Sequence, residues 1–288
     1  MALIKIPHTP IEEVEVPWNK PYFIKGYAHS MPAIEKWKDL DYFKDRMQNV
    51  DVDVEVYKTE KDFEMSRASI QTIPFNNYLE TMGDNSGNEQ PYIKMDKGGR
   101  TYVPDCDLRD FGNKIHQDIF TDLINPNDFR LGLQDGDGVP GVPDGYNLYI
   151  GVDTKTGMHA HIEDDFMLNQ IVGTKKVYCV DWHTLDLQPM WSKYNNFSKQ
   201  NFFDLDWDKI DIQYAELEPG DAFCFPPWTW HAVESSGYTC AITKVWERND
   251  QTWLYHKENQ DIPELKYRMW LSSFIPRLVY DWIRKMRG

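Results

Sequence analysis

The chain has 288 residues, with 46 acidic and 31 basic side chains and a formal net charge of −15. This length suits one large domain or two small ones with a substantial core, and an aromatic content of 14% excludes an intrinsically disordered chain. The acidic balance argues against a dedicated nucleic-acid binder, because affinity for phosphate comes mainly from lysine and arginine.

The cysteines form no CxxC pair and no zinc-ribbon spacing, which predicts buried thiols in a reducing compartment. They are Cys106, Cys179, Cys224 and Cys240. The first residues lack the apolar region of a signal peptide, and no apolar run approaches the roughly 20 residues that a membrane span needs. We therefore expect a soluble intracellular protein, in the cytoplasm with the nucleus as an alternative.

Short strands and helices alternate in the first part of the chain. Residues 20–26 resemble a buried strand after a proline, and residues 33–47 have the apolar spacing of a helix. Acidic residues alternate with valine over 51–56, which predicts a half-buried strand. Residues 74–82 are expected to form a short helix and residues 90–95 a strand.

The second part is predicted to be mainly strands. Residues 135–146, rich in glycine and proline, favour a loop or lid, as do residues 84–90. Short strands separated by turns then predict a sandwich or barrel, a mainly β fold with flanking helices. The expected strands cover residues 147–152, 157–163, 166–172, 175–180, 212–217, 222–225 and 239–246.

A helical pattern begins near residue 250, with apolar residues at largely helical spacing and prolines as breaks. These C-terminal helices are expected either to pack on the barrel or to form a homodimer through large aromatic side chains. The predicted organisation is therefore a barrel domain over 1–250 and a helical segment over 251–288.

Three polar side chains on one predicted strand mark a candidate metal site. The strand period of two places His159, His161 and Glu163 on a single face. Burying such groups without partners would cost about 1–3 kcal/mol each, and metal coordination removes that cost. His231, at the start of a later strand, adds a further candidate ligand. Two histidines and one carboxylate are the facial ligand set of non-haem Fe(II) oxygenases, whereas zinc prefers a closed tetrahedral set or three ligands and a water.

Lys175 is a candidate anion-binding residue. On a strand it shares a face with Val177 and Cys179, while Lys176 points to the opposite face. Burying a charged lysine on an apolar face is unfavourable unless an anion pairs with it. A dicarboxylate co-substrate would supply that anion. The alternative is a solvated lysine at a strand end.

These motifs resemble the JmjC, or cupin-like, Fe(II)/2-oxoglutarate oxygenases, and most closely their small asparaginyl-hydroxylase-type members. The resemblance covers most of residues 10–250. It is carried by His-x-Glu at 161–163, Asn-Gln-Ile-Val-Gly-Thr-Lys-Lys-Val at 169–177, and Leu-Glu-Pro-Gly-Asp-Ala-Phe-Cys-Phe-Pro-Pro-Trp-Thr-Trp-His at 217–231.

The resemblance implies a double-stranded β-helix, or jelly-roll barrel, that binds Fe(II), 2-oxoglutarate and O₂. It implies iron held by His161, Glu163 and His231, and a distal carboxylate of 2-oxoglutarate held by Lys175 with help from Tyr92. The implied reaction hydroxylates a substrate C–H bond and releases succinate and CO₂.

The sequence departs from the family pattern at several positions. Met158 stands where a threonine is frequent, and Phe166 lies near the place of a missing asparagine. The spacing from His161 to Gly173 is one residue shorter than usual and that from His159 is one longer, so His159 is a rival first ligand. Lys244 stands where an asparagine is common; it could add a second cation to the co-substrate site, mark a changed co-substrate, or lie at an exposed edge.

Three functions follow from these observations. The favoured one is a 2-oxoglutarate-dependent hydroxylase acting on a protein side chain or a small molecule. The second is a metal-binding cupin that does not use 2-oxoglutarate, in which His159 is a ligand. The third is a non-catalytic binding module that keeps the barrel.

Overall fold

The computed structural model describes residues 3–16, 18, 20–57, 61, 69–83, 100–107, 114–132, 143, 145–161, 164–180, 198, 200–226 and 229–247. All of them belong to one unit, Met1–Glu247, and the remaining unit, Arg248–Gly288, lies outside the described residues.

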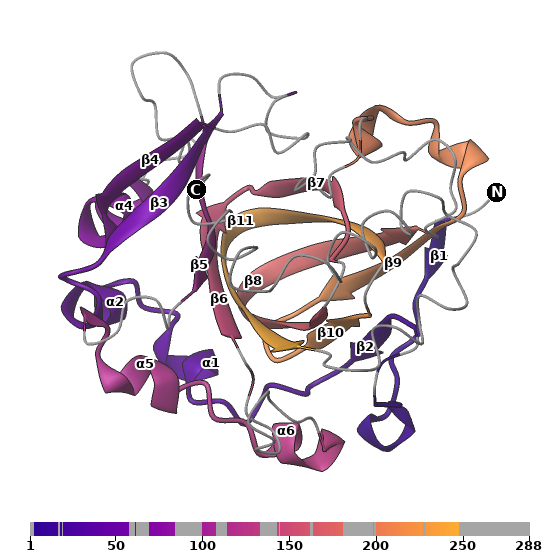
Figure 1. Ribbon diagram of the computed structural model, residues 1–288, viewed down its shortest axis with the longest axis horizontal. Helices are drawn as coiled ribbons and strands as arrows, with labels where there is room; N and C mark the ends of the chain where they lie inside the picture. Colours follow the sequence, from indigo (N-terminus) through magenta and orange to yellow (C-terminus); the bar gives the residue numbers. More distant parts are fainter. Residues whose placement is uncertain are drawn as a thin grey trace, which may run out of the picture. The chain divides into compact units, whose positions relative to one another are not determined.

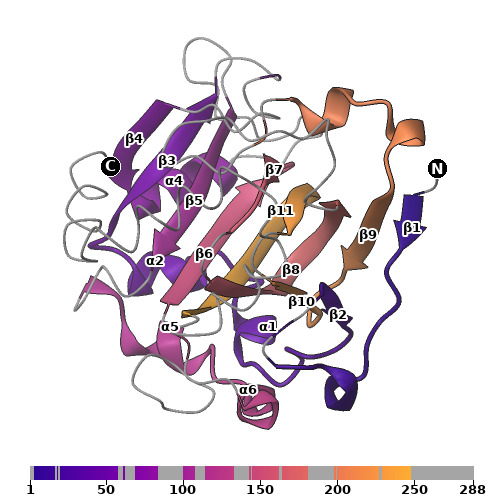
Figure 2. The same ribbon diagram turned by 45° about the vertical axis from the view of Figure 1, so that its right-hand side comes forward.

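The core of this unit is a curled, mostly antiparallel β-sheet. Its main path runs β1-β9-β8-β11-β6-β5-β3-β4, and Figure 2 shows these strands side by side. β10 joins β8 to β2, and β7 pairs with β11. The strands span Leu3–Lys5 (β1), Tyr22–Ile24 (β2), Asp51–Tyr57 (β3), Ser69–Pro74 (β4), Arg100–Asp107 (β5), Gly145–Val152 (β6), Lys155–His159 (β7), Asp164–Val180 (β8), Ile212–Leu217 (β9), Ala222–Phe225 (β10) and Trp230–Glu247 (β11).

The two longest strands, β8 and β11, pair with each other on both sides of a bend and so curl the sheet (Figure 1). The first part of β8, residues 166–169, pairs with β10 and with residues 242–245 of β11. Its last part, residues 175–180, pairs with β9 and with residues 230–235 of β11. The two parts of β8 therefore pair with different neighbours, β10 and β9, while both pair with β11.

Glycines with positive φ lie where these strands bend. Gly173 in β8 has φ +71° and Gly237 in β11 has φ +68°. A Cβ on Gly173 would lie 2.2 Å from the carbonyl oxygen of Tyr238, whereas a Cβ on Gly237 would meet nothing within 4 Å. Position 173 thus requires glycine for two reasons: the positive φ and the close approach of β11.

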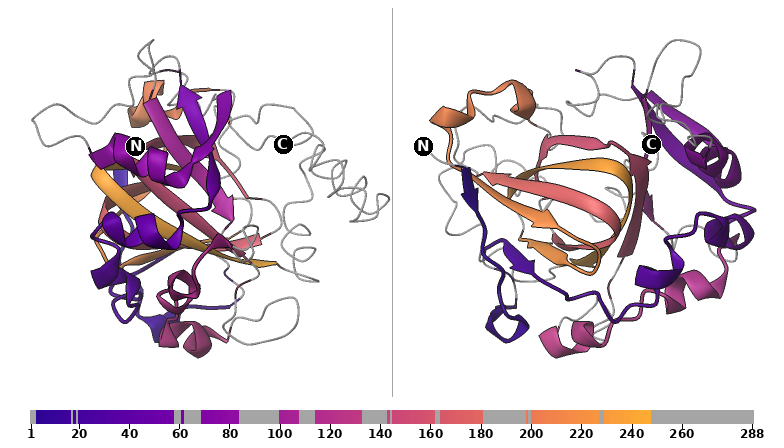
Figure 3. Two further views of the ribbon diagram at one scale, coloured as in Figure 1. Left: turned by 90° about the vertical axis from the view of Figure 1, so that its left-hand side faces the viewer. Right: turned by 180° about the vertical axis from the view of Figure 1, so that it is seen from behind.

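The inner face of the curled sheet carries an apolar cluster drawn from several strands. Val177 and Cys179 of β8 meet Ala215 and Leu217 of β9, with the phenylalanines of β10 beside them. Because side chains alternate along a strand, the register assigns the facing residues of β6, β7 and β11 to this same inner face. The view from behind in Figure 3 shows the strands surrounding it.

Short helices cover the outer face of β6 and of the second part of β11. Apolar side chains of Trp37, Phe43, Phe75 and Ile119 pack there against Leu148, Ile150 and Ile242 in the largest buried cluster. The helices are α1 (Ala33–Lys36), α2 (Asp41–Arg46), α4 (Phe75–Gly83), α5 (Gln117–Thr121) and α6 (Pro126–Leu131).

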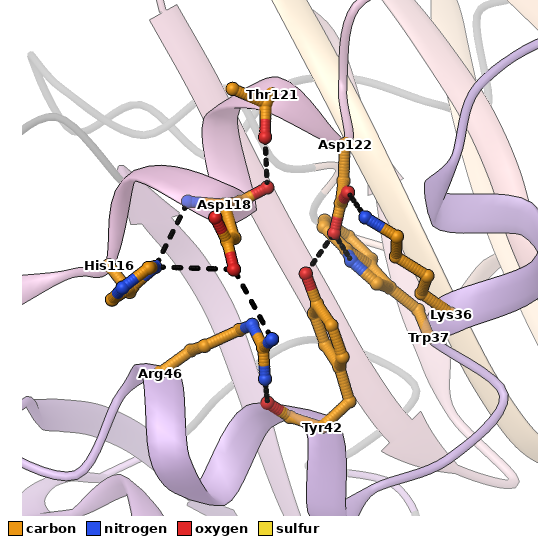
Figure 4. A network of polar contacts seen from close by, with 8 residues as sticks. All are labelled: Lys36, Trp37, Tyr42, Arg46, His116, Asp118, Thr121 and Asp122. Atoms are coloured by element: carbon orange, nitrogen blue, oxygen red, sulfur yellow. Dashed lines mark hydrogen bonds and ion pairs between the residues drawn. The ribbon is translucent and has the colours of Figure 1, made fainter.

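A buried carboxylate joins the helices of this layer (Figure 4). Asp122, at the end of α5, accepts hydrogen bonds from Lys36 Nζ at 2.5 Å, from Trp37 Nε1 at 3.2 Å and from the Tyr42 hydroxyl. The neighbouring Asp118 pairs with Arg46 at 3.2 Å in a more exposed position. One carboxylate therefore holds α1 and the start of α2 to α5.

The mainly β fold with flanking helices is confirmed, and several predicted elements have the expected bounds within a few residues. These are the strands β2, β3, β6, β9 and β10 and the helix α4.

Several expected elements have different bounds in the structure. Residues 33–47 form two helices rather than one, because the Asp39 side chain accepts a hydrogen bond from the Asp41 backbone N–H at 2.9 Å and starts a new helix there. The strands expected at 166–172 and 175–180 are one bent strand, and the strand expected at 239–246 is the second part of β11. The strand expected at 157–163 ends at His159.

Other expectations fall outside the described residues. They concern the strand at 90–95, the lid at 84–90, most of the loop at 135–146 and the helical segment 251–288 with its dimer. The division into a barrel domain and a helical segment stays a prediction. Among the described residues, no helix has the length and apolar character needed to cross a membrane.

The substitution Gly173→Ala tests the bend in β8. We expect it to lower the free energy of unfolding by about 2–4 kcal/mol, because the new Cβ overlaps backbone atoms in addition to adopting positive φ. Gly237→Ala is the matched control, with positive φ but open space, and should lose only about 1 kcal/mol. Urea denaturation measures the free energy of unfolding of both variants. Equal losses would contradict the claim that the close approach of β11 requires a glycine at position 173.

The substitution Asp122→Asn tests the buried carboxylate. It should destabilise the protein by about 1–3 kcal/mol, because it removes the charge that Lys36 meets and disturbs two further hydrogen bonds. Asp118→Asn, at a half-exposed ion pair, should cost about 1 kcal/mol or less. Chemical denaturation compares the two, and a larger loss for Asp118→Asn would refute the importance of Asp122.

Candidate metal centre and anion site

Three histidines converge at one end of the inner face. His159 is the last residue of β7, and His231 is the second residue of β11. The register pairs His231 with His159 on one side and with Cys179 of β8 on the other, so all three side chains share a face. His161 lies just beyond the end of β7.

The imidazoles are close enough to share one metal ion. Ring centroids lie 4.1 Å apart for His159 and His231, 5.0 Å for His161 and His231, and 5.2 Å for His159 and His161. One potential ligand atom from each lies within 4.8 Å of the others. The structure thus brings His161 and His231 together with the rival His159.

Two of these rings are oriented by hydrogen bonds to the backbone. His159 Nδ1 lies 2.8 Å from the carbonyl oxygen of Gly157, and His231 Nδ1 lies 2.9 Å from that of Thr229. A carbonyl oxygen can only accept, so each Nδ1 donates a proton and each Nε2 carries the lone pair. This second hydrogen bond is the arrangement that orients metal-binding histidines.

The environment favours the neutral form of His161 and His231. Burial lowers the pKa of His161 well below its ordinary value, and His159 lowers it further. Burial also lowers the pKa of His231, as do the two neighbouring histidines. Phe166 stacks on His161 with ring centroids 3.6 Å apart, and Phe225 lies 4.2 Å from His231. Neutral imidazoles against an aromatic wall are suited to bind a metal rather than protons.

The chemistry of these donors fits a first-row transition metal. Imidazole nitrogen suits iron, copper, nickel and zinc, and a carboxylate with two histidines favours Fe(II). The predicted carboxylate ligand, Glu163, lies outside the described residues, as does Tyr92, the predicted helper in 2-oxoglutarate binding. Which residue would supply a third ligand therefore remains between His159 and Glu163.

Lys175 lies on the inner face, as its strand position predicts. It pairs with Ser235 of β11 and with Leu217 of β9, whose side chain belongs to the inner cluster. Its side chain is only 4% exposed, and among the described residues it makes no ion pair and no hydrogen bond. Burial lowers the pKa of Lys175 to about 8, with Cys240 acting in the opposite direction.

The contact that the ammonium does make is with an aromatic ring that sequence reasoning missed. Lys175 Nζ lies 5.4 Å from the ring centroid of Tyr149 in β6. The sequence shows that Tyr149 alternates with Leu148 and Ile150 in a strand, but not which face is the inner one. The structure buries Leu148 and Ile150 on the outer face, so Tyr149 points inward.

Lys244 is placed away from the histidines. It alternates in β11 with Val245, which packs on the inner cluster, so it points to the outer face. There its ammonium donates to an Asp128 carboxylate oxygen at 2.5 Å and to the Leu123 carbonyl oxygen at 3.0 Å. The expectation that it adds a second cation to the co-substrate site does not agree with this placement. Nothing in the sequence indicated that Asp128, 116 residues earlier, would be the ion-pair partner of Lys244.

Comparison with known proteins agrees with this architecture. No curated protein matches the sequence. The model of one family, described as a cupin-like domain, matches residues 9–252, which include every strand from β2 to β11 and all the described candidate residues. The chain therefore belongs to the cupin-like domain family.

Proposed function

We propose that the protein is an Fe(II)- and 2-oxoglutarate-dependent oxygenase that hydroxylates a C–H bond and releases succinate and CO₂. The observation that carries the proposal is the combination, on one inner face, of a histidine cluster and a buried lysine without an anionic partner among the described residues. The first suits a metal, and the second suits a carboxylate.

The contrast between two buried lysines supports an anion at Lys175. Lys244 is fully buried and its charge is balanced by Asp128 at 2.5 Å. Lys175 is almost as buried but has only the Tyr149 ring nearby among the described residues. Burying a charged ammonium without a counter-ion is unfavourable, and binding an anion removes that penalty. This environment favours a binding site for an anion over a structural ion pair.

The spacing along β8 suits a small dicarboxylate. Cys179 is opposite His231, and Lys175 lies four residues earlier on the same strand and face. Four residues of strand span roughly 13 Å between Cα atoms. The lysine side chain and a dicarboxylate such as 2-oxoglutarate can together bridge this distance, with one end of the acid at the histidines and the other at the ammonium.

Each residue has a distinct part in this proposal. His161 and His231 hold the metal through ring nitrogens, with Glu163 or His159 as the third ligand. The bound Fe(II) supplies the activation of O₂ that is coupled to 2-oxoglutarate decarboxylation. Lys175 binds and orients the distal carboxylate. Phe166 and Phe225 exclude water from the metal-holding nitrogens.

A second candidate function rests on His159. Because its ring lies 4.1 Å from that of His231, a three-histidine metal site is available without Glu163. Such a site suits a cupin that uses its metal as a dioxygenase, isomerase or lyase without 2-oxoglutarate. That function leaves the buried ammonium of Lys175 unexplained, so we rank it second.

The proposed substrate is a protein side chain or a small molecule, and the formal charge of −15 favours a basic or neutral one. We propose that the protein acts in the cytoplasm. For residues 251–288, packing on the barrel and pairing of two copies stay equal predictions.

The substitution His231→Ala tests the metal centre. Wild-type protein loaded anaerobically with Fe(II) should melt at a higher temperature than the metal-free protein, because a ligand of the native state stabilises it. After O₂ is admitted, it should convert 2-oxoglutarate to succinate. His231→Ala should lose most of both effects, because it removes one metal-binding nitrogen.

The substitution His8→Ala is the control, since His8 is an exposed histidine outside the cluster. It should behave as the wild type. If His231→Ala still converts 2-oxoglutarate to succinate at the wild-type rate, the proposal is wrong. A metal-dependent rise in melting temperature with no consumption of 2-oxoglutarate would favour the second candidate. A melting temperature indifferent to both ligands would indicate a binding module.

The pH dependence of 2-oxoglutarate binding tests Lys175. Burial lowers the pKa of Lys175 to about 8, so the free protein loses the lysine proton as the pH rises through that value. The dianion requires the protonated lysine. Its affinity should therefore be constant near pH 7 and fall towards tenfold per pH unit above about pH 8. Calorimetric titration with Mn(II) bound measures this between about pH 6.5 and pH 9.5, on either side of the lysine pKa.

The variants Lys175→Arg and Lys175→Met show whether the pH dependence of the affinity comes from the charge at position 175. Arginine stays protonated throughout this range, so any affinity it retains should not fall with pH. Methionine removes the cation and should weaken binding at every pH. A wild-type affinity that stays flat up to pH 9.5, about 1.5 units above the lysine pKa, would contradict the role of Lys175.

A further inference from the structure

The contact between Lys175 and Tyr149 crosses the inner face of the curled sheet. Lys175 comes from the last part of β8, which pairs with β9, and Tyr149 comes from β6, which pairs with the second part of β11. The register places Tyr149 opposite Ala241, whose side chain belongs to the inner cluster. The ammonium therefore reaches from one group of strands to the other, where it lies 5.4 Å from the ring centroid.

Such a contact restrains a side chain that is otherwise flexible. A lysine has four rotatable bonds and can move its ammonium by several ångströms, whereas a tyrosine has two. Tyr149 is half-buried in β6, a strand that is paired on both sides. Attraction between an ammonium and an aromatic face is strongest when both are shielded from water. No carboxylate of the described residues competes for this ammonium.

We propose that Tyr149 is a positioning residue that fixes the ammonium of Lys175 and thereby sets the length of dicarboxylate the site accepts. The inference rests on the proposed function. With the histidines at one end and a restrained cation at the other, the distance between the two binding points is fixed. A dicarboxylate one carbon longer must then displace the ammonium from the ring.

The test compares the five-carbon 2-oxoglutarate with the six-carbon 2-oxoadipate. Their affinities are measured by calorimetry without O₂ and with Mn(II) bound, so the readout is binding and not turnover. Wild type should prefer 2-oxoglutarate. Tyr149→Phe keeps the ring and should retain both the affinity and the preference.

Tyr149→Leu removes the ring. It should weaken 2-oxoglutarate binding by roughly three- to thirtyfold and narrow the preference between the two acids. Tyr149→Met, with a longer side chain, makes the same test if Tyr149→Leu does not melt cooperatively. Tyr146→Leu is the matched control, because Tyr146 lies in the same strand but packs on the outer face against Phe120. It should leave the preference unchanged.

Three results would overturn the inference while leaving the proposed function intact, and two of them concern the preference between the acids. One is a wild type that binds both acids equally. The other is a set of ring-less variants that keep the wild-type affinity and preference. A loss of affinity in Tyr149→Phe equal to that in Tyr149→Leu would show that the hydroxyl, and not the ring, is responsible, and it would also overturn the inference. If wild type binds neither acid, the proposed function itself fails.

Discussion

The pairing of β8 with β11 is the constraint on which the rest of the structure depends. Both strands bend, yet they stay paired on either side of the bend, and Gly173 lets their backbones approach closely there. This pairing curls the sheet and gives it an inner face. It also places Cys179 beside His231 and Lys175 beside Ser235, in register. The proposed metal-binding and anion-binding ends of the site are therefore separated by a fixed length of one strand pair.

Electrostatics explains why such a site can serve an anionic co-substrate in an acidic protein. The net charge of −15 repels a dianion at long range, but short-range binding is decided by local charge and burial. Lys244 has its charge cancelled by Asp128 on the outer face, and that pair fastens β11 to α6. Lys175 keeps its charge uncancelled by any described residue on the inner face. The two lysines differ in their surroundings rather than in burial: Lys244 has a carboxylate beside it, and Lys175 has none among the described residues.

The sequence was sufficient for the mainly β fold class, because short strands and turns are visible as local alternation and spacing. The period of two placed Lys175 on the face of Val177 and Cys179, which is the inner face. His231 was joined to His161 by the ligand pattern and the family resemblance, and His161 lies beyond the end of β7, where strand alternation does not apply. Long-range features could not be read in this way. The Lys244 partner comes from a helix more than a hundred residues away in the chain, as its separation of 116 residues shows. The break between α1 and α2 depends on one local hydrogen bond, at Asp39, that competes with helical propensity.

The central claim is that the histidine cluster and Lys175 form one site. The most direct measurement is the calorimetric affinity of 2-oxoglutarate with and without Mn(II). If both ends bind the same molecule, the metal should strengthen 2-oxoglutarate binding by about tenfold or more, and 2-oxoglutarate should strengthen metal binding by the same factor. His231→Ala should abolish this coupling. Equal 2-oxoglutarate affinities with and without metal would contradict the account.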